Sequence, residues 1–168
     1  MNLTKQQRKE KLVIEYQECI KDLIDTDIVQ SMSQYIQHGD VTCLDHCKKV
    51  SWKSYKISKR LKLDYRSAAR GGLLHDFFLY DWHIPGSHVG FHGFRHSKTS
   101  LENALKHFDL NHKERDIIVK HMWPLNIVPP RFLESVVVTL VDKYYSSIET
   151  TITIKNWLKS LFKKKKHQ

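Results

Sequence analysis

Apolar residues recur with a helical period along nearly the whole chain, and this pattern constrains the fold more than any other feature of the sequence. After Thr42, for example, apolar side chains follow one another at spacings of three, four and seven residues up to Leu61. The run Val136–Thr139 is typical of a strand in isolation, but the longer helical repeat around it favours a helix. The pattern predicts an all-α fold, a bundle of about seven to eight helices.

Capping residues and breaks in the pattern give the expected boundaries. Helices are expected over residues ~4–24, ~27–37, 42–61, 64–78, ~96–108, 111–121, ~131–149 and ~152–162. The second is expected to end at Gly39, and the fourth contains small residues that permit a neighbour to approach closely. Residues 81–93, rich in glycine and histidine, are expected to form a functional loop.

The length of 168 residues fits a single domain spanning the whole chain. Its core is expected at about residues 42–148, preceded by helices over 4–38 and followed by a helix and basic tail over 152–168. No apolar run approaches the roughly 18 residues of a membrane span, and no secretory signal is recognisable. The three cysteines, of which Cys43 and Cys47 flank a histidine, are too few for a disulfide framework and are expected to be buried thiols in the cytoplasm.

The formal net charge of +10 favours anionic partners such as phosphorylated metabolites, nucleic acid or anionic lipid. Much of this charge lies at the two ends of the chain, including the run Lys163–Lys166. Such a tail is usually a solvated terminus, but attachment to nucleic acid or to another anionic surface stays open.

The pair His75-Asp76 is the strongest local indication of chemistry among the eleven histidines. It lies in an expected helix among small and apolar residues, where an ionised carboxylate is costly unless it is paired or binds a cation. Neighbouring side chains on a helix diverge by about 100°, so the helix must end or distort for both to reach one metal ion.

Further ligand types occur on other expected helices, far away in the sequence. His46 lies on the third expected helix, and Asp142 interrupts an apolar stretch. His96 follows the histidine-rich loop, and His121 ends a helix. Helix bundles build metal sites from inward side chains of this kind.

The order of these residues resembles the HD superfamily of metal-dependent phosphohydrolases. The family pattern H…HD…D matches His46, His75, Asp76 and Asp142, and the resemblance covers about residues 42–148. The segments LLHDFFLYDWH and HGFRHSKTSLENA are similar to small stand-alone bacterial members. The resemblance implies an HD-type helical bundle.

The resemblance also implies a site for two divalent transition-metal ions. His46, His75, Asp76 and Asp142 would hold one ion, and Asp76 would bridge to a second ion completed by His96 and His121. Mixed nitrogen and oxygen ligands favour Fe or Mn, with Zn, Co or Ni as further options. The implied reaction is attack of a metal-bound hydroxide on a phosphomonoester or phosphodiester, with His75 and Asp76 as the catalytic pair.

Several further side chains are candidates for substrate contacts. Lys143 follows a ligand, and the loop histidines could touch substrate; these candidates are Lys143, Arg66, Arg70, His83, His88 and His92. Trp82 and Trp123 are expected to pack, although either could stack on a base.

Two other functions remain open at this point. No Gly-Tyr-Pro signature follows His75-Asp76, and the Glu-Asp pair of alarmone hydrolases is absent, so the substrate is not specified. The same six ligands occur in mixed-valent di-iron oxygenases of the HD type. A metal-stabilised nucleic-acid-binding protein is the third hypothesis.

Overall fold

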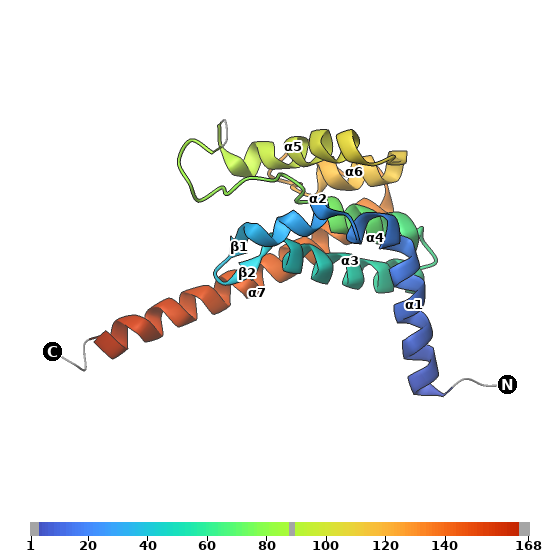
Figure 1. The fold of residues 1–168 in the computed structure, drawn as a ribbon, viewed down its shortest axis with the longest axis horizontal. Helices are drawn as coiled ribbons and strands as arrows, with labels where there is room; N and C mark the ends of the chain where they lie inside the picture. Colours follow the sequence, from blue (N-terminus) through green and yellow to red (C-terminus); the bar gives the residue numbers. More distant parts are fainter. Residues whose placement is uncertain (1–3, 88–89, 165–168) are drawn as a thin grey trace.

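The computed structural model describes residues 4–87 and 90–164, with side chains described as far as residue 160. His88 and the side chains of Lys163–Lys166 lie outside this description. Within it the chain has seven α-helices and one short two-stranded sheet. Figure 1 shows the helices packed as a bundle. The predicted all-α fold class is confirmed. None of the helices described is long and apolar enough to cross a bilayer.

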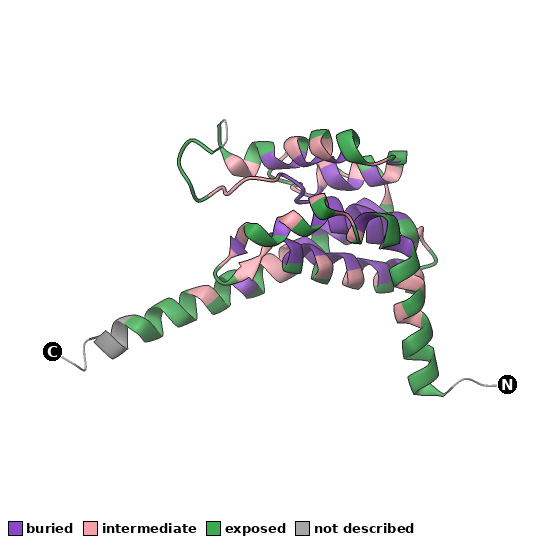
Figure 2. Ribbon diagram, in the orientation of Figure 1, coloured by how far each residue is buried: buried purple, intermediate pink, exposed green. Residues whose placement is uncertain are grey.

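The helices and strands follow one another along the chain with short connections between most of them. They are α1 (Lys5–Ile24), α2 (Asp27–Gln30), the 3-10 helix η1 (Ser31–Gln34), β1 (Ile36–His38), β2 (Val41–Thr42), α3 (Cys43–Arg60), α4 (Tyr65–Leu74), α5 (His92–His107), α6 (His112–Lys120) and α7 (Leu133–Lys164). Helix α4 packs against α1, α3, α6 and α7, and Figure 2 shows buried residues concentrated around it. The core therefore surrounds the helix that leads into His75.

The predicted capping residues begin their helices as expected. The Thr42 side chain accepts a hydrogen bond from the Asp45 backbone at the start of α3, and Asp64 accepts one from Ser67 at the start of α4. Asn111 forms a capping box at the start of α6. Each cap satisfies backbone N–H groups that the helix itself leaves without an acceptor.

Glycines in α4 allow its close contacts with two neighbouring helices. A Cβ atom on Gly72 would lie 3.0 Å from the Cα atom of Ser51 in α3. A Cβ atom on Gly71 would lie 2.7 Å from a side-chain carbon of Ile117 in α6. The small residues of α4 therefore permit the close approach that the sequence indicated.

Gly71→Ala is expected to lower the free energy of unfolding by about 1–2 kcal/mol, because the overpacking against Ile117 outweighs the gain in helix propensity. Urea denaturation measures the change. Gly93→Ala is the control, since its Cβ atom would lie an ordinary 3.4 Å from Leu125. Equal stability of the two variants would contradict the proposed tight contact.

The expected helix over residues 27–37 is wrong in its last part. The helical segment ends at Gln34, and β1 and β2 then form an antiparallel hairpin that pairs Ile36 with Thr42 and His38 with Val41. Gly39 does not end a helix but lies in the turn of this hairpin, with a φ of +59°. Glycine followed by aspartate between Ile36–His38 and the β-branched pair Val41-Thr42 favours such a turn, and this local preference prevails over the helical period.

Two other boundaries also differ from the sequence pattern. The helices expected over 131–149 and 152–162 are one continuous helix, α7, because Thr150 and Thr151 weaken a helix without breaking it. Helix α5 begins at His92 rather than near residue 96. The loop expected over residues 81–93 therefore ends before residue 92.

Candidate metal centre

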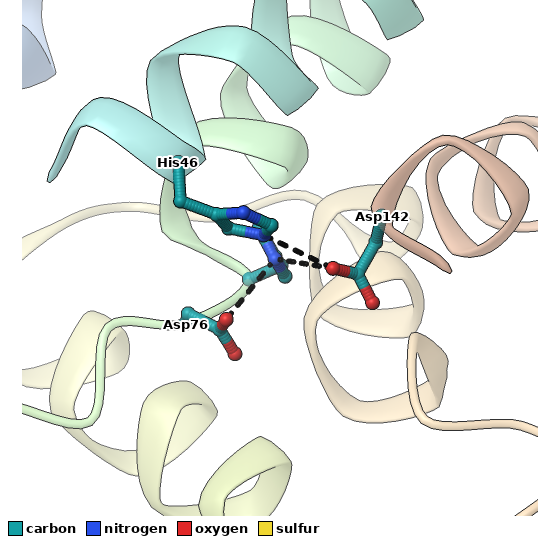
Figure 3. Close-up of side chains that lie close together, drawn as sticks. His46, Asp76 and Asp142 are labelled. Atoms are coloured by element: carbon teal, nitrogen blue, oxygen red, sulfur yellow. Dashed lines mark hydrogen bonds and ion pairs between the residues drawn. The ribbon is translucent and has the colours of Figure 1, made fainter. Parts of the chain in front are cut away.

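Four predicted ligands from different parts of the chain meet at the centre of the bundle. His46 comes from α3, Asp142 from α7 and Asp76 from the segment after α4, and Figure 3 shows these three side chains pointing toward one another. His75 is the C-cap residue of α4. One ligand atom from each lies within 4.8 Å of the others, and all four residues are buried. The Nε2 atom of His46 is 3.1 Å from Oδ1 of Asp142, and that of His75 is 3.5 Å from the same oxygen.

A second group of ligands adjoins the first and shares Asp76 with it. It adds His96 from α5 and His121 from the end of α6, both buried. Their Nε2 atoms lie 3.2 Å and 3.3 Å from Oδ1 of Asp76. The structure therefore brings together all six residues that the sequence indicated as metal ligands.

The carboxylate of Asp76 presents its two oxygens to the two groups separately. Oδ1 faces His96 and His121, while Oδ2 lies 3.3 Å from Nε2 of His75. A carboxylate placed in this way is able to bridge two cations, one bound by each group.

The end of α4 explains how adjacent residues reach one centre. The expected helix over 64–78 is too long at its end, because α4 ends at Leu74 with His75 as its C-cap. The chain then turns away from the helix axis, and the His75 and Asp76 side chains no longer diverge as they would on a regular helix. The distortion that the ligands require is thus present, and it lies earlier than the loop near Asp81 in which it was expected.

Hydrogen bonds orient every histidine of the centre through its Nδ1 atom. The Nδ1 atoms of His75, His96 and His121 lie 2.8–2.9 Å from the backbone carbonyls of Gly72, His92 and Ile118, respectively. Carbonyl oxygens only accept, so each Nδ1 carries the proton and each Nε2 is left to act as a ligand. This arrangement is typical of histidines that bind a metal.

The distances between these Nε2 atoms test whether a cation fits. The Nε2 atoms of His96 and His121 are 2.8 Å apart, and since both rings donate through Nδ1, two lone pairs face one another in the neutral forms. Nε2 of His75 and Oδ1 of Asp76 are buried and form no hydrogen bond with the described residues. Buried polar atoms without partners are costly, and a cation between them removes that cost. The residues present therefore fit metal ions.

The electrostatics of the centre also favour positive charge. Burial opposes ionisation of Asp76, but in the metal-free centre the charge of a protonated His75 holds the pKa of this carboxyl well below its ordinary value. Burial likewise opposes a charged ring at His46, yet the carboxylates of Asp142 and Glu149 raise its pKa to about 10. The carboxylates of Asp76 and Asp142 therefore stay ionised in a buried site, where they attract cations, whether protons or metal ions.

Sequence reasoning missed several residues that contact the ligands, among them Gln37 and Glu149. Gln37 in β1 donates from Nε2 to Oδ2 of Asp76 at 2.6 Å, so the hairpin holds the bridging carboxylate in place. Glu149 in α7 lies 2.8 Å from Nδ1 of His46 and is bound by Lys49 at 2.9 Å. Glu149 lies seven residues after Asp142, two turns along one helix, and this spacing was the available signal.

Glu149→Ala is expected to weaken metal binding by about 10- to 100-fold, because His46 loses the carboxylate that orients its ring. Glu149→Gln should retain more affinity than Glu149→Ala, since its amide oxygen still accepts from Nδ1. Competition with a chromogenic chelator measures both affinities. Equal affinities for the wild type and Glu149→Ala would show that Glu149 does not position His46.

The predicted substrate contacts divide into two sets. Lys143 and His92 line a cavity of about 260 Å³ that also contacts Asp76, His96, His121 and Asp142. Arg70 is buried elsewhere, with its Nε atom 2.8 Å from Glu114 and a second ion pair to Asp22. Arg66 is exposed beside Asp22, so the structure does not bring the two arginines to this cavity.

The remaining aromatic and cysteine residues lie as follows. Trp82 lines the cavity and stacks on His92 with ring centroids 5.1 Å apart. Trp123 does not line it and is 39% exposed, so the expectation that Trp123 packs is wrong. His83 binds Asp81 on the exposed segment before α5. Cys43 and Cys47 are buried free thiols, as the sequence predicted. The sulfur of Cys47 lies 3.8 Å from Nδ1 of His75.

Comparison with known proteins identifies no relative. The chain matches no protein-family model, no curated protein and no solved structure. An assignment of function to this chain therefore depends on the geometry of the site.

Proposed function

We propose that the protein is a metal-dependent phosphohydrolase of the HD type that binds two divalent transition-metal ions, with Fe or Mn favoured. The observation that carries the proposal is the position of Asp76, whose two oxygens face two separate ligand groups beside a cavity that also contains Lys143. A pair of bridged cations next to a lysine is suited to a phosphorylated substrate.

Two ions held by the six ligands would supply the chemistry of hydrolysis, since a bound metal ion polarises a phosphoryl oxygen and lowers the pKa of coordinated water from about 15.7 towards ~7. The protein residues hold the ligand atoms in place before any substrate arrives. Buried helices carry these ligands, and backbone carbonyls fix three of the four imidazole rings. Such rigid placement is what catalysis by positioned charges requires.

Lys143 supplies a positive charge on the substrate side of the centre. It follows Asp142 on α7, lines the cavity, and its Nζ atom lies 3.3 Å from the backbone carbonyl of His121. This contact keeps the ammonium group close to both ligand groups, where it is able to bind a phosphate oxygen.

Aromatic rings also line the cavity, Trp82 and His92 among them. His92 stacks on Trp82 and, with ring centroids 4.5 Å apart, on His96, while Tyr80 lies 3.0 Å from Nδ1 of His92. The small volume favours a phosphomonoester or phosphodiester with a compact group at the cleaved bond. We infer that a nucleotide would bind with its phosphate inside and its base at the rim near Trp82.

The test combines metal content with turnover. The purified chain should contain about two transition-metal ions, and should release phosphate or an alcohol from a panel of nucleotides and phosphoesters when Mn²⁺ or Fe²⁺ is present. Lys143→Ala should raise KM more than it lowers kcat, because it removes a contact to the phosphate. Arg66→Ala is the control and should retain turnover, since Arg66 is exposed and does not line the cavity.

The same measurements separate the other functions. Oxygen uptake with an electron-spin signal from a half-reduced iron pair, and no phosphate release, would assign the centre to an oxygenase. Salt-dependent binding to RNA that survives His75→Ala and Asp76→Ala, again without phosphate release, would assign the protein to nucleic-acid binding.

A further inference from the structure

The carboxyl-terminal part of α7 projects from the body of the protein, as Figure 1 shows. Thr153 and Asn156 line a small cavity together with the β1–β2 hairpin, and a Cβ atom on Gly39 would contact Thr153. From Trp157 to Ser160 every residue is exposed, which Figure 2 displays along the projecting end of the helix. This segment extends beyond the hairpin into solvent.

The projecting segment has an apolar side. Ile154, Trp157 and Leu158 are spaced three and four residues apart, so their side chains lie on one side of the helix. They are 51%, 58% and 40% exposed, respectively. A soluble helix rarely presents three large apolar side chains together in water, and such a patch indicates a binding surface.

Lysines lie at the edge of this apolar side. Lys155 and Lys159 are one turn apart, both exposed, on the adjacent side of the helix. No acidic residue follows Glu149 in the sequence, whereas six lysines do. The segment therefore combines an apolar face with uncompensated positive charge.

The apolar side continues along the part of α7 that packs on the body. Leu140 is 18 residues, or about five turns, before Leu158 and so lies on the same side of the helix. It is 60% exposed, and Tyr144, one turn later, is 56% exposed. The outer side of the helix that carries Asp142 and Lys143 is thus apolar at both ends.

We propose that this outer side of α7 binds an anionic lipid surface, with the helix lying in the plane of the headgroups. Ile154, Trp157 and Leu158 would enter the boundary between headgroups and acyl chains, and the flanking lysines would contact lipid phosphates. Lipid contact would also stabilise a helical segment that lacks packing of its own, since short isolated helices are marginal in water.

Charge and apolar surface together favour lipid over other partners. In a second copy of the chain Lys155 and Lys159 border the same apolar side, so two such helices packed side by side would bring like charges together. Nucleic acid would satisfy the lysines but would leave the apolar patch exposed to water. An anionic bilayer surface accommodates both features at once.

Flotation of the metal-loaded full-length chain with vesicles tests the proposal. The chain should float with vesicles of three parts phosphatidylcholine and one part phosphatidylserine, and far less with pure phosphatidylcholine or at about 0.5 M salt. Lys155→Glu/Lys159→Glu and Trp157→Ser/Leu158→Ser should each lower the partition coefficient at least about tenfold. Because these residues are exposed, both variants should keep the metal content and helicity of the wild type.

Matched changes elsewhere on the surface serve as controls. Lys98→Glu/Lys106→Glu alters the charge of α5 by the same amount at exposed positions and should not change vesicle binding by more than about twofold. Absence of flotation by the wild type, or equal flotation of the wild type and the α7 variants, would overturn the proposal. So would a lipid-free dimer that Trp157→Ser/Leu158→Ser dissociates, or RNA binding that this variant retains, because either result would assign the surface to another partner.

Discussion

Asp76→Asn is expected to lose both metal ions and at least about a thousandfold in kcat, the largest effect of any single change in the site. The amide keeps the shape of the side chain but lacks the negative charge that both ligand groups share. Metal analysis should give fewer than one ion per chain, and turnover of the best phosphoester in the panel should fall in parallel. A loss of only one ion would be the expected result for His96→Ala, which alters the second group alone.

The control for this prediction is Asp81→Asn, five residues further along the same segment. Asp81 binds His83 and does not line the cavity, so its change should leave metal content and kcat close to those of the wild type. Two ions retained in Asp76→Asn would contradict the bridging role of Asp76. Loss of ions in both variants would instead indicate that the segment after α4 is damaged by either change.

The six ligands could be predicted from the sequence because their types are unusual where they occur. A carboxylate in an apolar stretch, as at Asp142, is costly unless it has a partner, and His75-Asp76 interrupts a stretch that is otherwise small or apolar. The resemblance of their order to the HD pattern grouped them into one site with two parts. A helical bundle is able to bring such residues together because their side chains point inward from facing helices.

The residues that support the ligands could not be predicted in the same way. Gln37 contacts Asp76 across 39 positions of sequence, and it does so from a hairpin that the helical period concealed. Arg70 has the spacing of a phosphate contact one turn from Arg66, but its side chain points to the buried Glu114. Which way a side chain on a central helix points depends on how its neighbours pack, and sequence spacing does not contain that information.

Helix boundaries show the same division between local and tertiary causes. Thr42, Asp64 and Asn111 mark helix starts through hydrogen bonds within a few residues, so the sequence alone identifies them. No glycine or proline follows Leu74 directly to mark the end of α4 in the sequence. There His75 donates from Nδ1 to the Gly72 carbonyl. We infer that the contacts of the site, rather than a local sequence pattern, determine where the helix ends.

Removal of the metal ions is expected to lower the melting temperature by about 10–20 °C. At a free concentration of about 100 times its dissociation constant, each bound ion adds about 2.7 kcal/mol to the free energy of unfolding. For a chain of this size each kcal/mol corresponds to about 2–4 °C in melting temperature. The physical reason is the buried pair of carboxylates, Asp76 and Asp142, and the facing Nε2 atoms of His96 and His121. Differential scanning calorimetry before and after dialysis against a chelator measures the shift, and added Mn²⁺ should reverse it.

Asp76→Asn separates this effect from a general action of the chelator. The variant has lost the ligand common to both groups, so chelation should change its melting temperature by no more than about 2 °C. Asn at this position also removes the charge that pairs with His75 in the metal-free centre, and the metal-free variant should therefore melt below the temperature of the metal-free wild type. A wild-type melting temperature that chelation leaves unchanged would contradict the proposed centre, because buried carboxylates and imidazoles that gain nothing from a cation must already be satisfied by one another.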